Sequence, residues 1–217
     1  SKTGYTGEEI GYELYIHPDN AARLWNLMLE KGKQFGIKPC GLATRDSTRI
    51  EAGLPLYGND LAGKYDISPI EAGFGPYVKF HKPFFIGREK ILEREKSRKM
   101  EMIRFRMNRK GIRRVKNGDV VVNMNGQYIG NVTSCAPNAE GYQMGLALVD
   151  KKFTQEGTEI GIFSLPHGKE LEKEEQVNRL KFEEEKPKIQ LKLGEKVLMH
   201  EKAVVLPRFM IEKGKME

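Results

Sequence analysis

The sequence predicts an α+β fold in two parts, a mixed part over residues 1–97 and an antiparallel β-barrel domain over residues 98–217. Two observations support this prediction. Up to about residue 97, helical and extended patterns follow one another irregularly, without the repeated strand–helix–strand unit of a doubly wound sheet. After residue 99, short runs rich in Val, Ile, Tyr and Met are separated by Gly, Asn and Asp, which is typical of a small barrel or sandwich.

The chain opens with a glycine-rich turn, a strand and a helix. The strand is predicted over residues 12–16. The helix after it has Asp19 or Asn20 as its expected N-cap, because a short polar side chain accepts a hydrogen bond from a free backbone N–H of the first turn. Its apolar residues recur at helical spacing as far as about Phe35. The sequence begins inside this motif and without a Met, so we expect it to be part of a longer protein.

Three further helices and one strand are predicted before residue 98. A helix over residues 42–52 should end at Gly53, because glycine adopts the left-handed conformation of a helix C-cap at little cost. Residues 68–71 indicate a helix start, with Ser as the cap and Pro in the first turn. A strand over residues 76–80 and a charged amphipathic helix over residues 85–97 complete this part.

The second part is predicted to consist of short antiparallel strands. Five runs have strand character, namely residues 101–107, 119–124, 127–134, 142–149 and 158–163. Asn125-Gly126 between the second and third runs is a signal for a two-residue hairpin turn. Residues 166–187 are dense in Lys and Glu and are expected to form a charged insertion, either an exposed loop or an additional charged hairpin. Residues 188–206 return to strand character and should complete the barrel.

The composition restricts the partners of this chain. Its net charge of +7 favours anionic partners, although many of the charges lie in mixed runs typical of a solvated surface. Aromatic residues do not alternate with Lys and Arg as they do where bases stack, so no nucleic-acid partner is expected. No apolar run approaches the roughly 18 residues that span a membrane, and no targeting segment is visible.

The residues with the most versatile chemistry form no recognisable catalytic or metal motif. Cys40 and Cys135 lie far apart without a CxxC spacing, so we expect free, buried thiols in a reducing compartment. The four histidines lack ligand spacing, which predicts no metal site. The dinucleotide, P-loop and nucleophile-elbow motifs are absent as well.

Glu13 is the first candidate binding residue. In the predicted strand its side chain points to the face opposite Tyr12 and Leu14. A half-buried carboxylate there requires donors. An amino group beside a ring N–H, as in pterins and guanines, offers two parallel donors that one carboxylate can accept together. The alternative is a surface glutamate, or one paired with a nearby arginine.

Arg45 is the second candidate, together with Arg49 one helical turn later. Residues four apart share a helix face, so two guanidinium groups there could hold a carboxylate ligand or fix Glu13. Equally, they could form structural ion pairs with nearby acids, namely Asp46, Glu51 or Glu71. The spacing by itself does not decide between these roles.

Four motifs carry a family resemblance in their order along the chain. They are Thr-Gly-Tyr-Thr-Gly-Glu at residues 3–8 with Gly-Tyr-Glu at 11–13, the block at 41–60, Pro-Ile-Glu-Ala-Gly-Phe-Gly at 69–75, and Phe-Ile-Gly-Arg-Glu at 85–89. The sequence resembles the T-protein of the glycine cleavage system, an aminomethyltransferase. Residues 130–134 and 145–149 resemble the hairpin of its C-terminal barrel. The resemblance extends to about residue 163 and returns at 203–209.

The resemblance implies a fold and a reaction. The fold is the later part of a folate-binding, ferredoxin-like α+β core, followed by the barrel. The family takes an aminomethyl group from the lipoyl arm of the carrier H-protein, passes the one-carbon unit to tetrahydrofolate and releases ammonia. Glu13 and Arg45 stand at positions where the family binds folate, and Tyr12 and Phe209 are expected beside them. The implied compartment is the cytoplasm of a bacterium or the mitochondrial matrix of a eukaryote.

The sequence departs from the family in two places. The family's catalytic Asp lies upstream of residue 1, so no catalytic residue is expected in this chain, which alone should be inactive. The turn at residues 8–11 is one residue longer than in most T-proteins. This leaves open another folate-dependent one-carbon transferase or demethylase of the same superfamily. A non-catalytic folate-binding regulatory module is a third alternative.

Overall fold

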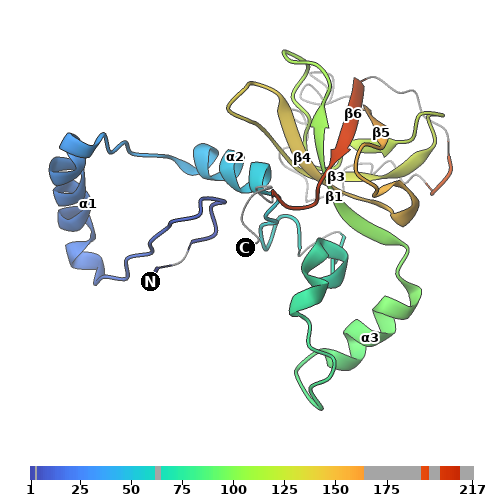
Figure 1. Cartoon of the computed structure of the whole chain (residues 1–217), viewed down its shortest axis with the longest axis horizontal. Helices are drawn as coiled ribbons and strands as arrows, with labels where there is room; N and C mark the ends of the chain where they lie inside the picture. Colours follow the sequence, from blue (N-terminus) through green and yellow to red (C-terminus); the bar gives the residue numbers. More distant parts are fainter. Residues whose placement is uncertain (3, 62–64, 164–191, 196–200, 211–217) are drawn as a thin grey trace, which may run out of the picture.

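A closed antiparallel barrel forms the second part of the chain (Figure 1). The structure is a computed structural model and describes residues 1–2, 4–61, 65–163, 192–195 and 201–210. The barrel strands are β1 (Met100–Met107), β2 (Val120–Val122), β3 (Tyr128–Pro137), β4 (Gln143–Asp150), β5 (Glu159–Phe163) and β6 (Glu201–Leu206). Their order is β1-β4-β3-β2-β5-β6, and β1 also pairs with β6. The prediction of a barrel is therefore confirmed.

The barrel interior follows from the period-two pattern of the strands. Alternate residues of a strand point to the same face, and here that face is apolar and buried. The core cluster takes such residues from all six strands, for example Ile103, Phe105 and Met107 from β1. Gly130 lies in close contact with β4, since a Cβ at this position would lie 2.0 Å from the carbonyl oxygen of Leu148. The barrel thus depends on both apolar residues and a residue without a side chain.

The turn between β2 and β3 is longer than predicted. The Asn123 N–H donates to the carbonyl oxygen of Gln127, which leaves residues 124–126 as a three-residue loop. Gly126 has a φ of 74°, the left-handed conformation that such a loop requires. The Asn123 side chain accepts hydrogen bonds from the backbone N–H groups of Asn125 and Gln127. This side-chain bridge stabilises the longer loop in place of a two-residue turn.

The helices precede the barrel in the sequence. They are α1 (Pro18–Gly32), η1 (Lys33–Phe35), α2 (Leu42–Ala52), η2 (Ile70–Phe74), η3 (Gly75–Tyr77) and α3 (Arg88–Ser97), and η4 (Lys151–Phe153) follows β4. The end of α2 was predicted correctly, since Gly53 caps it with a φ of 84°. The predicted start of α1 at Asp19 or Asn20 was wrong, because His17 is the N-cap and Pro18 occupies the first helical position. In Figure 1, α1 lies far from the barrel and the end of α2 lies beside it.

The predicted strands over residues 12–16 and 76–80 are not present. A strand exists only where a neighbouring strand accepts its hydrogen bonds. In the first segment, Glu13 and Ser1 exchange backbone hydrogen bonds of 3.0 and 2.8 Å, but no ladder extends from this pair. In the second, local turns form instead, with the Lys82 N–H donating to the carbonyl of Lys79. Both sequences have strand-like composition without a described partner.

The predicted helix start at Ser68 is confirmed as a local motif. The Ser68 hydroxyl accepts from the Glu71 N–H at 3.2 Å, and the Glu71 carboxylate accepts from the Ser68 N–H at 2.8 Å. The segment after it, η2, is a short irregular helix because Gly73 interrupts it with a φ of 89°. The boundary near residue 98 stays a prediction, and the charged insertion at 166–187 lies outside the described residues.

The two cysteines are free, as predicted, but one of them is not buried. Cys40 is exposed and Cys135 is partly buried on β3. Burial raises the pKa of the Cys135 thiol to about 12, with the Asp119 carboxylate acting in the same direction. Cys40 follows Pro39 in the link before α2, where no element covers it.

Alkylation should therefore distinguish the two thiols. At pH 8 the thiolate fraction of Cys135 is about one part in ten thousand, because only the deprotonated form is nucleophilic. We expect iodoacetamide to modify Cys40 at least about tenfold faster than Cys135. Mass spectrometry of peptides from a time course measures both rates in one sample. Equal rates in the folded protein would contradict the burial of Cys135.

Candidate functional site

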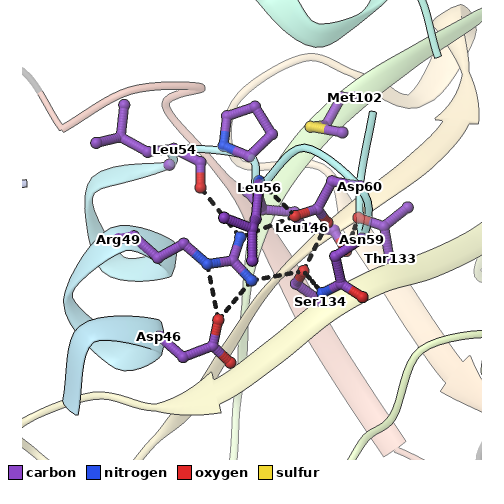
Figure 2. Close-up of polar contacts among 12 residues, drawn as sticks. Asp46, Arg49, Leu54, Leu56, Asn59, Asp60, Met102, Thr133, Ser134 and Leu146 are labelled. Atoms are coloured by element: carbon purple, nitrogen blue, oxygen red, sulfur yellow. Dashed lines mark hydrogen bonds and ion pairs between the residues drawn. The ribbon is translucent and has the colours of Figure 1, made fainter. Parts of the chain in front are cut away.

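A buried arginine network joins α2 to the barrel (Figure 2). The Arg49 side chain is 0% exposed. Its Nε donates to Asp46 at 2.7 Å, and its Nη1 donates to the Asp60 carboxylate at 2.8 Å and to the Leu54 carbonyl at 3.1 Å. Its Nη2 donates to the Ser134 hydroxyl of β3 at 3.0 Å. One guanidinium thus fixes the helix, the loop after it and a barrel strand.

Asp60 is the buried partner of Arg49 and has its own set of donors. Its side chain accepts from the Ser134 hydroxyl at 2.6 Å and from the Leu56 N–H at 2.8 Å. A buried carboxylate is tolerated only when a cation and hydrogen bonds replace its hydration. The network meets this condition, and it decides the alternatives for Arg49 in favour of a structural ion pair.

The glycine-rich turn packs against the same end of α2. A Cβ at Gly7 would lie 2.6 Å from the Cβ of Ala52, so only glycine fits at this contact. The Tyr5 hydroxyl donates to the Pro55 carbonyl at 2.8 Å. Burial raises the pKa of Tyr5, while the positive charges of Arg208, Arg49 and Arg45 oppose this shift. Tyr5 therefore lies near three arginines and also near the Asp60 carboxylate, which raises its pKa further.

The segment after β6 closes this region from another side. Arg208 donates to the carbonyl of Gly53 and, at 3.1 and 2.7 Å, to the carbonyl of Ala72. Its guanidinium lies 4.4 Å from the centre of the Phe209 ring, which packs 5.4 Å from the ring of Phe74. Burial lowers the pKa of Arg208 to about 10, so the side chain is still a cation at neutral pH.

Two of the predicted binding residues lie near the cluster formed by Tyr5 and Arg208. Phe209 is partly buried beside Arg208, and Arg45 lies exposed on α2 near enough to influence the pKa of Tyr5. Glu13 lies outside this cluster, with its carboxylate accepting from the exposed Tyr15 hydroxyl at 2.9 Å. Tyr12 is 67% exposed. No hydrogen bond or ion pair given for the described residues joins Glu13 to Arg45.

Sequence reasoning missed three residues of this region. Asp60 and Ser134 lie within recognised motifs, but nothing in their spacing indicates that each meets Arg49. Arg208 follows a proline near the end of the chain and has no periodic pattern around it. Ser134 and Asp60 are separated by 74 positions in the sequence, and Arg208 and Ala72 by 136. Contacts over such separations leave no local pattern in the sequence.

The part of the chain that the structure describes contains neither a metal-binding cluster nor a membrane-spanning helix. No group of three or more His, Cys, Asp or Glu residues is placed to hold a metal ion there. Within the same residues, no helix is long and apolar enough to cross a membrane.

Comparison with known proteins gives consistent results in sequence and structure. Residues 1–82 match the family model of the GCVT N-terminal domain. The aminomethyltransferase of Caldanaerobacter subterraneus is 44% identical over 165 residues, which are 75% of this chain and 42% of that protein. The aminomethyltransferase of Bacillus subtilis is 41% identical over 165 residues, with 75% and 44% covered.

The fold also matches a solved structure. The crystal structure of glycine cleavage system aminomethyltransferase T from Bartonella henselae has a TM-score of 0.68 and 24% identity, covering 95% of this chain and 48% of that chain. The chain thus spans less than half the length of the relatives it matches. The resemblance seen in the motifs is confirmed: over three quarters of its length this chain is similar to part of known aminomethyltransferases, and its fold matches part of a glycine cleavage system T-protein.

Proposed function

We propose that the protein containing this chain is a tetrahydrofolate-dependent aminomethyltransferase of the glycine cleavage system. In the proposed reaction, an aminomethyl group carried by the lipoyl arm of the H-protein is the donor and tetrahydrofolate is the acceptor, with release of ammonia. The observation that carries the proposal is the 44% identity to an aminomethyltransferase over three quarters of this chain. In a bacterial host, like those of the relatives named above, the expected compartment is the cytoplasm; in a eukaryotic host it is the mitochondrial matrix.

The proposed folate site contains Glu13, Tyr12, Arg45 and Phe209. The Glu13 carboxylate is exposed, and so is the Tyr15 hydroxyl that donates to it, so the carboxylate is available to two parallel donors of a pterin. Arg45 supplies a cation for a carboxylate of the ligand. Residues 1–97 are proposed to be the later part of a ferredoxin-like folate-binding core, and 98–217 the barrel domain.

Loss of the Glu13 carboxylate should weaken folate binding. We expect Glu13→Ala in the full-length protein to reduce tetrahydrofolate affinity by about 1–3 kcal/mol, because the donor edge of the pterin loses its charged acceptor. Isothermal titration calorimetry of tetrahydrofolate measures the change. Glu8→Ala is the matched control, since Glu8 is an exposed carboxylate of the same turn. Unchanged affinity in Glu13→Ala would remove Glu13 from the site.

The reaction itself is tested with the donor. The full-length protein should form 5,10-methylenetetrahydrofolate from an aminomethyl-lipoyl carrier and tetrahydrofolate. Turnover of dimethylglycine or sarcosine with tetrahydrofolate instead would favour a demethylase, an alternative that the longer turn at residues 8–11 supports. Tetrahydrofolate binding without turnover of any of these donors would favour a regulatory module.

A further inference from the structure

We propose that a polar pocket beside β3 binds a compact oxyanion, the phosphate or carboxylate group of a small molecule, through Arg114 and Lys116. The pocket has a volume of about 320 Å³. It lies between the loop at residues 114–117 that leads into β2, residues 133–135 of β3 and Asp46 of α2. Its lining residues are Asp46, Asn59, Arg114, Val115, Lys116, Asn117, Thr133, Ser134 and Cys135. None of the proposed folate-binding residues lines it, so this inference does not rest on the proposed function.

The loop that carries the two cations is held in place from both sides. Val115 is buried, and its N–H donates to the Gln143 side chain at 2.7 Å. The Gln143 amide donates in turn to the carbonyl of Arg113 at 2.9 Å. The buried Asp119 carboxylate accepts from the Lys116 N–H at 2.9 Å. Because the backbone is fixed on either side of Arg114, the loop is preorganised for a ligand.

The floor of the pocket is equally rigid. Ser134 cannot rotate freely, because its hydroxyl accepts from Arg49 and donates to Asp60 (Figure 2). Thr133 donates to the Leu146 carbonyl at 3.2 Å. Cys135 is a neutral thiol at physiological pH, since burial raises its pKa to about 12. The floor therefore adds no free charge to the pocket.

The charge balance of the pocket favours an anion. Asp46 is the acidic residue in its lining, and one of its oxygens is already paired with Arg49 at 2.7 Å to Nε and 2.5 Å to Nη2. Residues 109–118 contain five basic and no acidic residues. The structure gives no ion pair between Arg114 or Lys116 and an acidic group of the described residues. Two exposed cations thus line a rigid polar pocket whose lining carboxylate, Asp46, is already paired with Arg49.

The size and chemistry of the pocket restrict the ligand. A volume of about 320 Å³ is near the lower end of the roughly 300–1,000 Å³ range of small-molecule pockets. A guanidinium offers two parallel N–H donors that match a phosphate or carboxylate group, and an ammonium adds a point charge beside it. Asn59 and Asn117 add neutral side-chain amides to the lining, and the Asn59 amide also donates to the Ser134 hydroxyl at 3.3 Å. A compact oxyanion satisfies all of these groups.

Titration of the intact protein at constant ionic strength tests the proposal. Inorganic phosphate and succinate are titrated separately by calorimetry, so that the tighter of the two identifies the preferred oxyanion. We expect one saturable site, and we expect Arg114→Gln and Lys116→Gln each to weaken it by about tenfold. Arg113→Gln is the matched control, an exposed cation of the same loop outside the pocket, and should change affinity by less than about twofold.

Two results would overturn the proposal. One is the absence of saturable binding of either anion to the unaltered protein. The other is an equal loss of anion affinity in Arg113→Gln and Arg114→Gln, which would indicate diffuse electrostatic attraction to a basic surface. Arg114 and Lys116 are exposed, so their replacement should leave the fold intact, and a thermal unfolding curve of each variant verifies this.

Discussion

Arg49→Met should lower the free energy of unfolding by about 3–5 kcal/mol, as expected when a buried ion pair loses one partner. Methionine fills most of the space of the arginine side chain but leaves Asp60 as a buried carboxylate without a cation. It also removes the donor to Ser134 and therefore the connection between α2 and β3. Urea denaturation of the full-length protein, followed by circular dichroism, measures the change.

Two further variants separate this effect from other causes. Arg45→Met is the control, because Arg45 lies on the same helix but is exposed, and its replacement should change stability by less than about 0.5 kcal/mol. Asp60→Asn in the Arg49→Met background should restore part of the loss, since a neutral amide no longer requires a counter-charge. A loss below about 1 kcal/mol in Arg49→Met would show that the network contributes little to stability.

The second large effect is expected at Gly130, near the start of β3. A Cβ there would lie 2.0 Å from the carbonyl oxygen of Leu148 and 2.8 Å from the Cα of Val149. These are backbone atoms of β4, which cannot rotate away as a flexible side chain would. Gly130→Ala should therefore separate the two strands and destabilise the protein by about 3 kcal/mol or more, at the upper end of overpacking effects.

Gly41→Ala provides the matched control for this substitution. Gly41 has an extended conformation, with φ −89° and ψ −179°, and a Cβ there would have no neighbour within 4 Å. Its replacement should cost about 1 kcal/mol or less, because alanine adopts this backbone without strain and loses only the preference for glycine at a helix N-cap. Thermal unfolding of both variants measures the difference. Similar melting temperatures for Gly130→Ala and the unaltered protein would contradict the close approach of β3 and β4.

The sequence predicted best what local physical chemistry determines. The end of α2 at Gly53 follows from glycine's backbone freedom, and five barrel strands follow from short runs rich in Val, Ile, Tyr and Met that are separated by turn residues. The segments at 12–16 and 76–80 have the same strand-like composition, but a strand also requires a neighbour, which composition does not encode. Cys40 was expected to be buried because cysteine usually is, whereas its position in an open link leaves it exposed.

The candidate site was less predictable than the fold. The family motifs indicated Glu13 and Arg45, but they did not indicate which groups lie around them. Arg49 has two acidic neighbours within three residues, Asp46 and Glu51, and it pairs with Asp46. The partners that join it to the loop and to the barrel, Asp60 and Ser134, lie further along the chain. Choosing among them requires the packing of α2 against the barrel, a tertiary contact that helical spacing does not determine.

The position of β6 has a consequence for the order of events during synthesis. β5 ends at Phe163, yet β6, which must pair with both β5 and β1, begins only at Glu201. At roughly 5–20 residues per second, a ribosome needs several seconds to make the intervening stretch. During this interval the nascent barrel has two unpaired edges, at β1 and β5, which are prone to pair with other chains. We expect this protein to be most vulnerable to aggregation just before β6 emerges, and to benefit from a chaperone that shields those edges.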